Sequence, residues 1–175
     1  MADFNSRAAA IRLVCFDVDG TLTDGRLIFD SQGHESKAFH VHDGQGLRLL
    51  EDSGIAVALI TARQSRIVQT RGSDLRLKYV YDGVKDKLAV LQSICIQEGL
   101  TLNQVAYMGD DYPDLACLQS VGLATCPADA MPTIRNSVHW CSSRPGGSGA
   151  ARELADLILT VQGKLEALQH RYGAP

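Results

Sequence analysis

A short apolar run that ends in an acidic, glycine-containing segment constrains this chain more than any other feature. Residues 11–16 read Ile-Arg-Leu-Val-Cys-Phe, and the segment 17–25, Asp-Val-Asp-Gly-Thr-Leu-Thr-Asp-Gly, follows directly. A β-branched and aromatic run bounded by glycine is typical of a buried strand. Because side chains alternate in direction along a strand, we expect Asp17 and Asp19 to project the same way from its carboxyl end. Two neighbouring carboxylates repel each other, which indicates a site that holds a cation or a shared proton.

Length and composition predict one globular domain over residues 1–175. The chain is 45% hydrophobic and 21% charged, as in an ordinary soluble protein. The net charge is −3 and no block of Lys and Arg is present, which argues against a nucleic-acid partner. No apolar stretch is long enough to span a bilayer, and residues 1–10 lack the apolar core of a signal peptide.

The cysteines favour a reducing compartment and exclude one enzyme class. There are five of them, an odd number without a C-x-x-C pair, which predicts reduced thiols in a cytoplasmic protein. A cysteine-dependent phosphatase needs an Arg six positions after its Cys, and none of the five cysteines has one. These cysteines are Cys15, Cys95, Cys117, Cys126 and Cys141.

Apolar strands alternate with amphipathic helices along the rest of the chain, which predicts an α/β fold with a parallel sheet between two helical layers. The expected later strands are 55–60, 78–81, 104–108, 121–125 and 138–140, with helices over 43–51, 64–73, 85–98 and 150–169 and one after Pro113. Asp43 is expected to cap the first of these helices. Residues 26–30 and 36–40 are expected to pair as a β-hairpin around Ser31-Gln32-Gly33.

Polar residues follow four of these elements where a parallel sheet brings ligands together. Right-handed crossovers place the carboxyl ends of parallel strands on one edge, and ligands of open α/β sheets bind there. The sequence therefore predicts a single active site built from these ends. The residues concerned are Asp17 and Asp19, Thr61, Lys85 and Lys87, and Asp110 and Asp111.

These motifs together resemble the haloacid dehalogenase (HAD) superfamily of aspartyl-phosphate phosphatases. The matching features are D-x-D-G-T at 17–21, Thr61, Lys87 and G-D-D-x-x-D at 109–114, in the family's order and strand contexts. The resemblance implies a Rossmann-like three-layer sandwich and a Mg²⁺-dependent phosphatase.

The resemblance also implies a role for each residue. Asp17 would be the nucleophile, and Asp19 would protonate the leaving oxygen and then deprotonate water. The Asp17 and Asp110 carboxylates and the Asp19 carbonyl would bind Mg²⁺. Thr61 and Lys87 would bind the phosphoryl oxygens.

Several of these residues have structural alternatives. Thr61 can cap the following helix instead, and Lys85 competes with Lys87 for the phosphate. Asp111 and Asp114 would orient the metal ligands in the family pattern, but both can also serve as helix-terminal residues.

Neither gap between the motifs is long enough for the cap domain that many relatives carry. The capless relatives that this chain resembles act on phosphorylated sugar acids of eight or nine carbons and form homotetramers through their hairpins. Arg63 and the turn containing Gly147 and Ser148 are candidates for binding such a substrate. Ala62 and Ser148 depart from the usual pattern, which has Gly and a basic residue there.

A protein that is phosphorylated on Asp without turnover is the alternative from a different class. Receiver domains of signalling proteins also combine an acidic cluster with a Thr and a Lys. They place the accepting Asp on a later strand than the acidic pair, whereas Asp17 and Asp19 stand together here.

Overall fold

A six-stranded parallel sheet forms the centre of the molecule. In the computed structural model, which describes residues 2–173, the strand order is β5-β4-β1-β6-β7-β8 and all five neighbouring pairs are parallel. The strands are β1 (Leu13–Phe16), β4 (Ala56–Ile60), β5 (Tyr79–Tyr81), β6 (Val105–Met108), β7 (Leu123–Cys126) and β8 (Trp140–Cys141). The predicted α/β fold with a central parallel sheet is confirmed.

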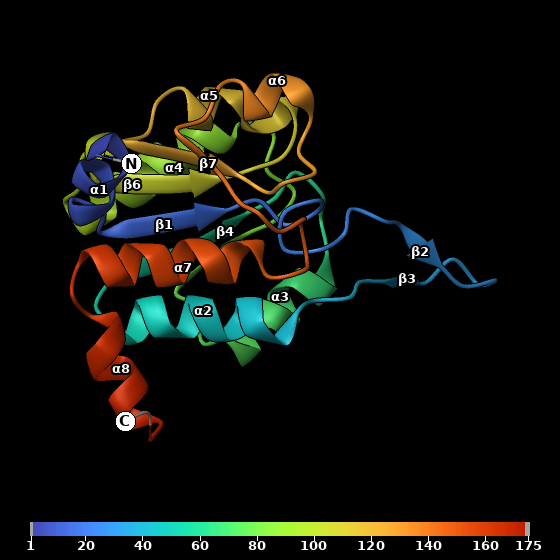
Figure 1. The fold of residues 1–175 in the computed structure, drawn as a ribbon. Coiled ribbons are helices and arrows are strands. Elements are labelled where there is room, and N and C mark those ends of the chain that lie inside the picture. Colours follow the sequence, from blue (N-terminus) through green and yellow to red (C-terminus); the bar gives the residue numbers. More distant parts are fainter. Residues whose placement is uncertain (1, 174–175) are drawn as a thin grey trace.

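Helices cover both faces of this sheet (Figure 1). On one face lie α2 (Val41–Asp52), α3 (Arg66–Asp74) and α7 (Ala150–Val161), and on the other lie α4 (Lys87–Glu98), α5 (Leu115–Leu118) and α6 (Pro132–Arg135). The remaining helical segments are α1 (Ala2–Ala9), η1 (Leu102–Gln104), η2 (Tyr112–Asp114) and α8 (Leu165–Arg171).

The strands are apolar because both sides of the sheet are covered. Every residue of β1, β6 and β7 is buried, as expected for parallel strands between two helical layers. Alternate residues of β1 enter different cores: Val14 and Phe16 pack toward α2 and α7, whereas Leu13 and Cys15 pack toward α4 and α5. This rigid centre fixes the positions of the loops at its carboxyl edge.

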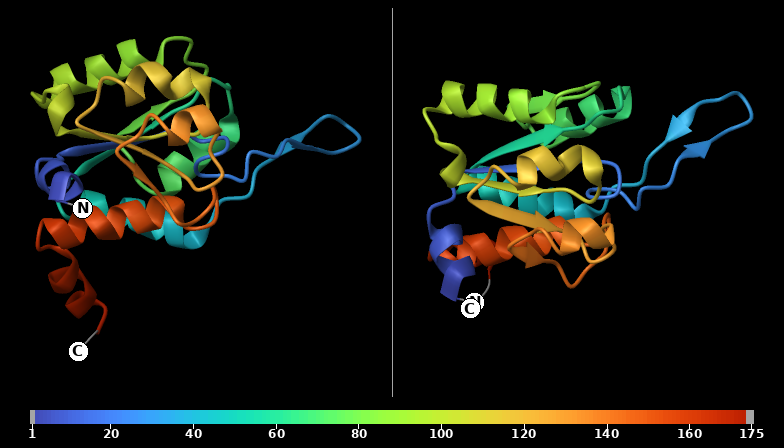
Figure 2. Two further views of the ribbon diagram at one scale, coloured as in Figure 1. Left: turned by 45° about the horizontal axis from the view of Figure 1, so that its top comes forward. Right: turned by 90° about the horizontal axis from the view of Figure 1, so that it is seen from above.

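The hairpin extends away from the body of the protein (Figure 2). Its strands, β2 (Ile28–Phe29) and β3 (Glu35–Ser36), are shorter than the predicted 26–30 and 36–40. The Asp30 carboxylate accepts hydrogen bonds from the N–H groups of Gln32 and His34, which shapes the connecting loop at the expense of further strand pairing.

Asp43 caps a different helix from the one predicted. His40 occupies the N-cap of α2, and Asp43 lies within its first turn. The buried Asp43 carboxylate instead accepts hydrogen bonds from the N–H groups of Gly149 (3.2 Å) and Arg152 (2.9 Å) at the start of α7. The prediction failed because the partner N–H groups are more than a hundred residues away in sequence. Asp43 therefore ties two neighbouring helices together.

We expect Asp43→Ala to lower the free energy of unfolding by about 2 kcal/mol, because two donors at a helix N-terminus lose their acceptor. The thermal midpoint should fall by about 5 °C in a chain of this length. Asp74→Ala, at an exposed helix end, is the matched control and should change the midpoint little. Equal midpoints for the two variants would contradict the capping role.

The C-terminal region contains two helices where the sequence predicted one over 150–169. α7 ends at Val161, Gly163 adopts a left-handed conformation (φ 66°), and α8 begins at Leu165. In the turn, the Gln162 side chain donates to the carbonyls of Ala8 and Ile11. These contacts fix the break, and periodicity alone does not reveal it.

All five cysteines carry free thiols, in agreement with the sequence. Between residues 2 and 173, no helix combines the length and apolar character needed to cross a bilayer.

Candidate active site

The carboxyl ends of the three adjacent strands β4, β1 and β6 meet at one cavity of about 250 Å³. Its lining consists of residues that follow these strands or begin the next helix. They are Asp17, Asp19, Thr61, Ala62, Arg63, Lys87, Asp110, Asp111, Pro113 and Asp114. The sequence-predicted convergence at one sheet edge is therefore observed.

Asp17 lies at the bottom of this cavity in contact with a buried lysine. It follows the last residue of β1, its N–H donates to the carbonyl of Met108, and it is only 6% exposed. The Lys87 ammonium donates to Asp17 Oδ1 at 2.6 Å and to Asp114 Oδ1 at 2.7 Å. A single cation thus holds the carboxylate that follows β1 and the carboxylate of η2 at fixed separation.

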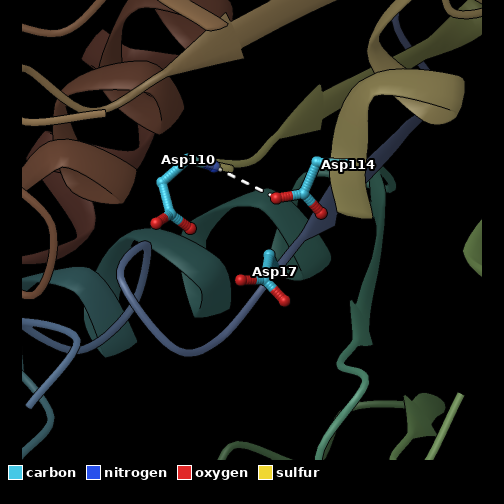
Figure 3. Close-up of side chains that lie close together, drawn as sticks. All are labelled: Asp17, Asp110 and Asp114. Carbon is cyan, nitrogen blue, oxygen red and sulfur yellow. Dashed lines mark hydrogen bonds between the residues drawn. The ribbon is translucent and has the colours of Figure 1, made fainter. Parts of the chain in front are cut away.

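Three carboxylates point toward one another at this position (Figure 3). One oxygen from each of Asp17, Asp110 and Asp114 lies within 4.8 Å of the other two, and this is the only cluster of three or more potential metal-ligating side chains within residues 2–173. Thr21 Oγ1 donates to Asp110 Oδ1 at 3.3 Å. The predicted Asp17–Asp110 pair is brought together, and Asp114 joins it.

Asp114 has no free position for a metal ion, because each of its oxygens already accepts two hydrogen bonds. Oδ1 accepts from Lys87 and from the Tyr107 hydroxyl (2.8 Å). Oδ2 accepts from the backbone N–H groups of Asp110 (3.1 Å) and Asp111 (3.4 Å). Asp114 therefore holds Lys87 and the Asp110 loop in place and leaves the cation to Asp17 and Asp110.

Burial and mutual repulsion shift the titration of these carboxyl groups. Burial, with added repulsion from Asp114, raises the pKa of Asp17 to about 8 although Lys87 opposes the shift. The same two causes raise the pKa of Asp110 to about 6. A hard divalent cation between Asp17 and Asp110 would remove this repulsion, since carboxylate oxygens are its preferred ligands. The donor set fits Mg²⁺.

Glycine is required where the first loop passes this cluster. Gly20 has φ 91°, and a Cβ atom there would lie 2.2 Å from Asp110 Oδ2. Any side chain at position 20 would therefore displace the Asp110 carboxylate from Asp17.

Asp19 shares the cavity with Asp17 but contacts different partners. Its Oδ1 forms an ion pair with Lys37 of the hairpin, and its Oδ2 lies 3.8 Å from Arg63 Nε. Arg63 Nη2 also donates to Glu35 Oε1 at 2.8 Å. Arg63 is thus exposed at the mouth of the cavity, between the hairpin and Asp19.

The structure distinguishes two of the alternatives left open by the sequence. Thr61 does not cap α3, because Ser65 is the N-cap residue, and the buried Thr61 hydroxyl lines the cavity. Lys85 is exposed, whereas Lys87 is buried against Asp17.

For Asp111, both alternatives from the sequence remain open, a helix-terminal role and a role in the site. Its carboxylate accepts from the N–H of Tyr112 at 2.8 Å and caps η2, while the residue also lines the cavity.

The turn containing Gly147 and Ser148 is not part of this cavity. The N–H of Gly147 donates to the Thr21 carbonyl, and that of Ser148 donates to the Pro145 carbonyl. Gly146 and Gly149 donate to Asp129 and Asp43 as well. All four backbone N–H groups of residues 146–149 are thus already used within the chain, and substrate binding by Gly147 and Ser148 stays a prediction. A Cβ at position 146 would lie 1.9 Å from the Gly20 carbonyl oxygen, so this turn supports the loop after Asp19.

Two residues of the site escaped sequence reasoning. Tyr107 is an aromatic polar residue in an otherwise aliphatic strand, three positions before Asp110, and this pattern could have indicated a buried hydroxyl with a polar partner. Lys37 directly follows the second strand of the hairpin, and no spacing rule connects it to Asp19.

The fold and the site define the class of protein. The chain has the constellation of a HAD-superfamily phosphohydrolase: Asp17 after β1, Thr61 after β4, Lys87 at the start of α4 and Asp110 with Asp111 after β6. No family model matches the chain. A HAD superfamily (subfamily III A) protein of Legionella pneumophila superposes with a TM-score of 0.95 at 42% identity, covering 98% of this chain and 94% of that one.

Closer comparison identifies the family. The 3-deoxy-D-manno-octulosonate 8-phosphate phosphatase KdsC of Yersinia pestis is 42% identical over 164 residues, 94% of this chain and 88% of the relative. The corresponding phosphatase of Moraxella catarrhalis, solved with magnesium, phosphate and KDO, has a TM-score of 0.95 at 37% identity, covering 98% and 99% of the two chains. A hypothetical protein of Xanthomonas campestris is 53% identical with a TM-score of 0.97, covering 99% and 95%. The chain belongs to the KdsC family of 3-deoxy-D-manno-octulosonate 8-phosphate phosphatases.

Proposed function

We propose that this chain is a Mg²⁺-dependent phosphatase that hydrolyses 3-deoxy-D-manno-octulosonate 8-phosphate to the free sugar acid and phosphate. The observation that carries the proposal is the placement of Asp17 between Lys87 and Asp110 at the bottom of the cavity. The relative of Moraxella catarrhalis binds magnesium, phosphate and KDO. The corresponding role is a step of lipopolysaccharide precursor synthesis in the cytoplasm, carried out by a single domain without a cap.

Asp17 is the proposed nucleophile. One of its carboxylate oxygens attacks phosphorus while the bond from phosphorus to the sugar oxygen breaks, and an aspartyl phosphate forms. Lys87 keeps this carboxylate oriented and offers positive charge to the phosphoryl oxygens, and the Thr61 hydroxyl is a further donor from β4.

Asp19 is the proposed acid and base. It gives a proton to the departing sugar oxygen and then removes one from the water that hydrolyses the aspartyl phosphate. The Asp17 and Asp110 carboxylates and the Asp19 carbonyl would hold Mg²⁺, which when bound neutralises the carboxylates and the phosphate dianion. Asp111 and Asp114 support the loop that carries Asp110.

Arg63 is the proposed contact for the substrate carboxylate. It lies at the mouth of the cavity with its side chain 43% exposed, and its present partner Glu35 is also a carboxylate. We expect Arg63→Ala to reduce kcat/KM for octulosonate 8-phosphate by about tenfold to a hundredfold, since a charged hydrogen bond contributes about 1.5–3 kcal/mol.

Released phosphate from a panel of esters tests both the function and this role. The panel contains octulosonate 8-phosphate, a nine-carbon sugar acid 9-phosphate and a neutral sugar phosphate, each with wild type and Arg63→Ala. A preference of the wild type for the nine-carbon ester would overturn the proposed substrate. Equal losses on the acidic and neutral esters would mean that Arg63 does not bind the carboxylate.

We propose that the hairpin assembles the chain into a homotetramer. Leu27, Ile28 and Phe29 are each about half exposed on a two-stranded projection, which is unusual for a free surface. Phe39, which follows the hairpin, packs against the core instead, with Arg71 over its ring. A closed symmetric assembly would cover the three remaining residues.

Substituting Phe29 by Ser should lower the measured mass in solution from that of a tetramer, because the apolar contact between hairpins is lost. Light scattering on purified protein gives this mass directly. Ile96→Ser, which removes an exposed apolar side chain far from the hairpin on α4, is the control and should leave the mass unchanged. A monomeric wild type with full activity would refute the assembly.

A further inference from the structure

The hairpin places the side chain of one lysine, Lys37, in the active site. Lys37 directly follows β3. The residues on either side of Lys37 are exposed, yet the Lys37 side chain is only 1% exposed. Its ammonium group forms an ion pair with Asp19 Oδ1 and lies 3.4 Å from Glu35 Oε1. A lysine is rarely buried without a charged partner, so this contact fixes the position of the side chain.

Glu35 connects Lys37 to the body of the protein. The same oxygen that faces Lys37 accepts from Arg63 Nη2 at 2.8 Å. Desolvation raises the pKa of Glu35, but the bonds from Arg63 and Lys37 outweigh it and hold the pKa below its usual value. A charged Glu35 therefore fixes both cations that face Asp19.

The two oxygens of Asp19 are chemically different because of this arrangement. Oδ1 accepts from the Lys37 ammonium, so a carboxyl proton on Oδ1 would point at a cation. Oδ2 is buried without a hydrogen-bond partner, and its nearest cationic group, Arg63 Nε, is 3.8 Å away. A proton carried by Asp19 must therefore be on Oδ2.

We propose, on the basis of the function proposed above, that Lys37 is the positioning residue for proton transfer by Asp19. Lys37 holds Oδ1 and directs Oδ2 toward the reacting group. The Oδ2–H bond breaks as the proton passes to the sugar oxygen, whose bond to phosphorus breaks at the same time. In the second half, a water proton returns to Oδ2 as the water oxygen bonds to phosphorus and the Asp17–phosphorus bond breaks.

This role makes proton transfer depend on where the hairpin lies. Lys37 and Glu35 both belong to the hairpin stem, and the same hairpin carries the exposed apolar residues 27–29. A shift of the hairpin would move the Lys37 ammonium and release Oδ1. No other part of the fold supplies a hydrogen bond to either Asp19 carboxylate oxygen within residues 2–173.

The test compares esters whose leaving groups differ in their need for a proton. 4-Nitrophenolate departs without protonation, whereas phenolate and the sugar alkoxide depart poorly without it. We expect Lys37→Met, with Mg²⁺ present, to slow the first turnover of octulosonate 8-phosphate and phenyl phosphate by about 100-fold, the lower range of general acid catalysis. The rate of the first-turnover burst of 4-nitrophenolate should fall by less than about fivefold, because this leaving group does not need the proton that general acid catalysis supplies.

Two variants complete the comparison. Lys37→Arg keeps a cationic donor and should restore much of the rate with the poor leaving groups. Lys85→Met removes an exposed lysine outside the cavity and should match wild type on all three esters. Mass and thermal midpoint are measured for every variant.

Three outcomes would overturn the proposal. An equal loss on good and poor leaving groups would assign Lys37 to the phosphate or to the fold, and no loss on any ester would remove it from the mechanism. Failure of Lys37→Arg to restore any rate would exclude a simple cationic positioning role. If the proposed substrate is wrong, wild type will not turn over octulosonate 8-phosphate. The two aryl esters would still test the role of Lys37 in that case.

Discussion

Asp17→Asn is expected to abolish turnover, with a loss on the order of 10⁴-fold or more, as for removal of the nucleophile in other covalent mechanisms. The amide has nearly the same size as the carboxylate, and its oxygen can still accept the hydrogen bond from Lys87. What disappears is the charge that attacks phosphorus. Phosphate release from octulosonate 8-phosphate in the presence of Mg²⁺ measures the loss.

The matched control is Asp24→Asn in the same loop. Asp24 is exposed, and within residues 2–173 the polar contacts of its carboxylate are with Arg26 alone, so this variant should retain wild-type activity. Asp19→Asn should also be severely impaired, because both proton transfers lose their donor and acceptor. Substantial hydrolysis by Asp17→Asn, in protein of normal mass and thermal midpoint, would contradict the aspartyl-phosphate mechanism.

The sequence was sufficient to predict the site residues that come directly after strands. Asp17, Thr61 and Asp110 each come immediately or two residues after a buried apolar run, and parallel strands place such residues on one edge whatever the strand order. The sheet order itself, with β4, β1 and β6 adjacent, was not predicted, because strand pairing depends on crossovers between distant segments.

The contacts that the sequence did not predict all join distant segments through side chains. Asp43 follows helix-capping rules, but it caps α7 across the interface between α2 and α7. Lys37 reaches Asp19 only because the hairpin stem folds back over the cavity. Spacing rules describe neighbours within one element, so they cannot assign partners of this kind.

The second large effect is expected from removal of the metal ion. Chelation should abolish activity and lower thermal stability, because the buried carboxylates of Asp17, Asp110 and Asp114 then repel one another with only the single charge of Lys87 to offset them. Added Mg²⁺ should restore both. A ligand at a hundred times its dissociation constant stabilises the folded state by about 2.7 kcal/mol.

This stabilisation should increase with pH. Without the ion, the folded-state pKa values of Asp17 (about 8) and Asp110 (about 6) lie above their unfolded values. The folded state therefore binds more protons than the unfolded state between about pH 4 and pH 8, and the metal-free protein loses stability as pH rises through that window. Mg²⁺ competes with these protons for the same oxygens, so it stabilises most where they have dissociated.

Thermal midpoints with chelator and with Mg²⁺, measured at pH 5.5 and at pH 8.5, test this expectation without an activity assay. The difference between the two midpoints should be small at pH 5.5 and several degrees at pH 8.5. Asp110→Asn removes one of the two carboxylates proposed to bind the ion, and in this variant the difference at pH 8.5 should largely disappear. A difference that does not change with pH, or that survives in Asp110→Asn, would place the Mg²⁺ site away from Asp17 and Asp110.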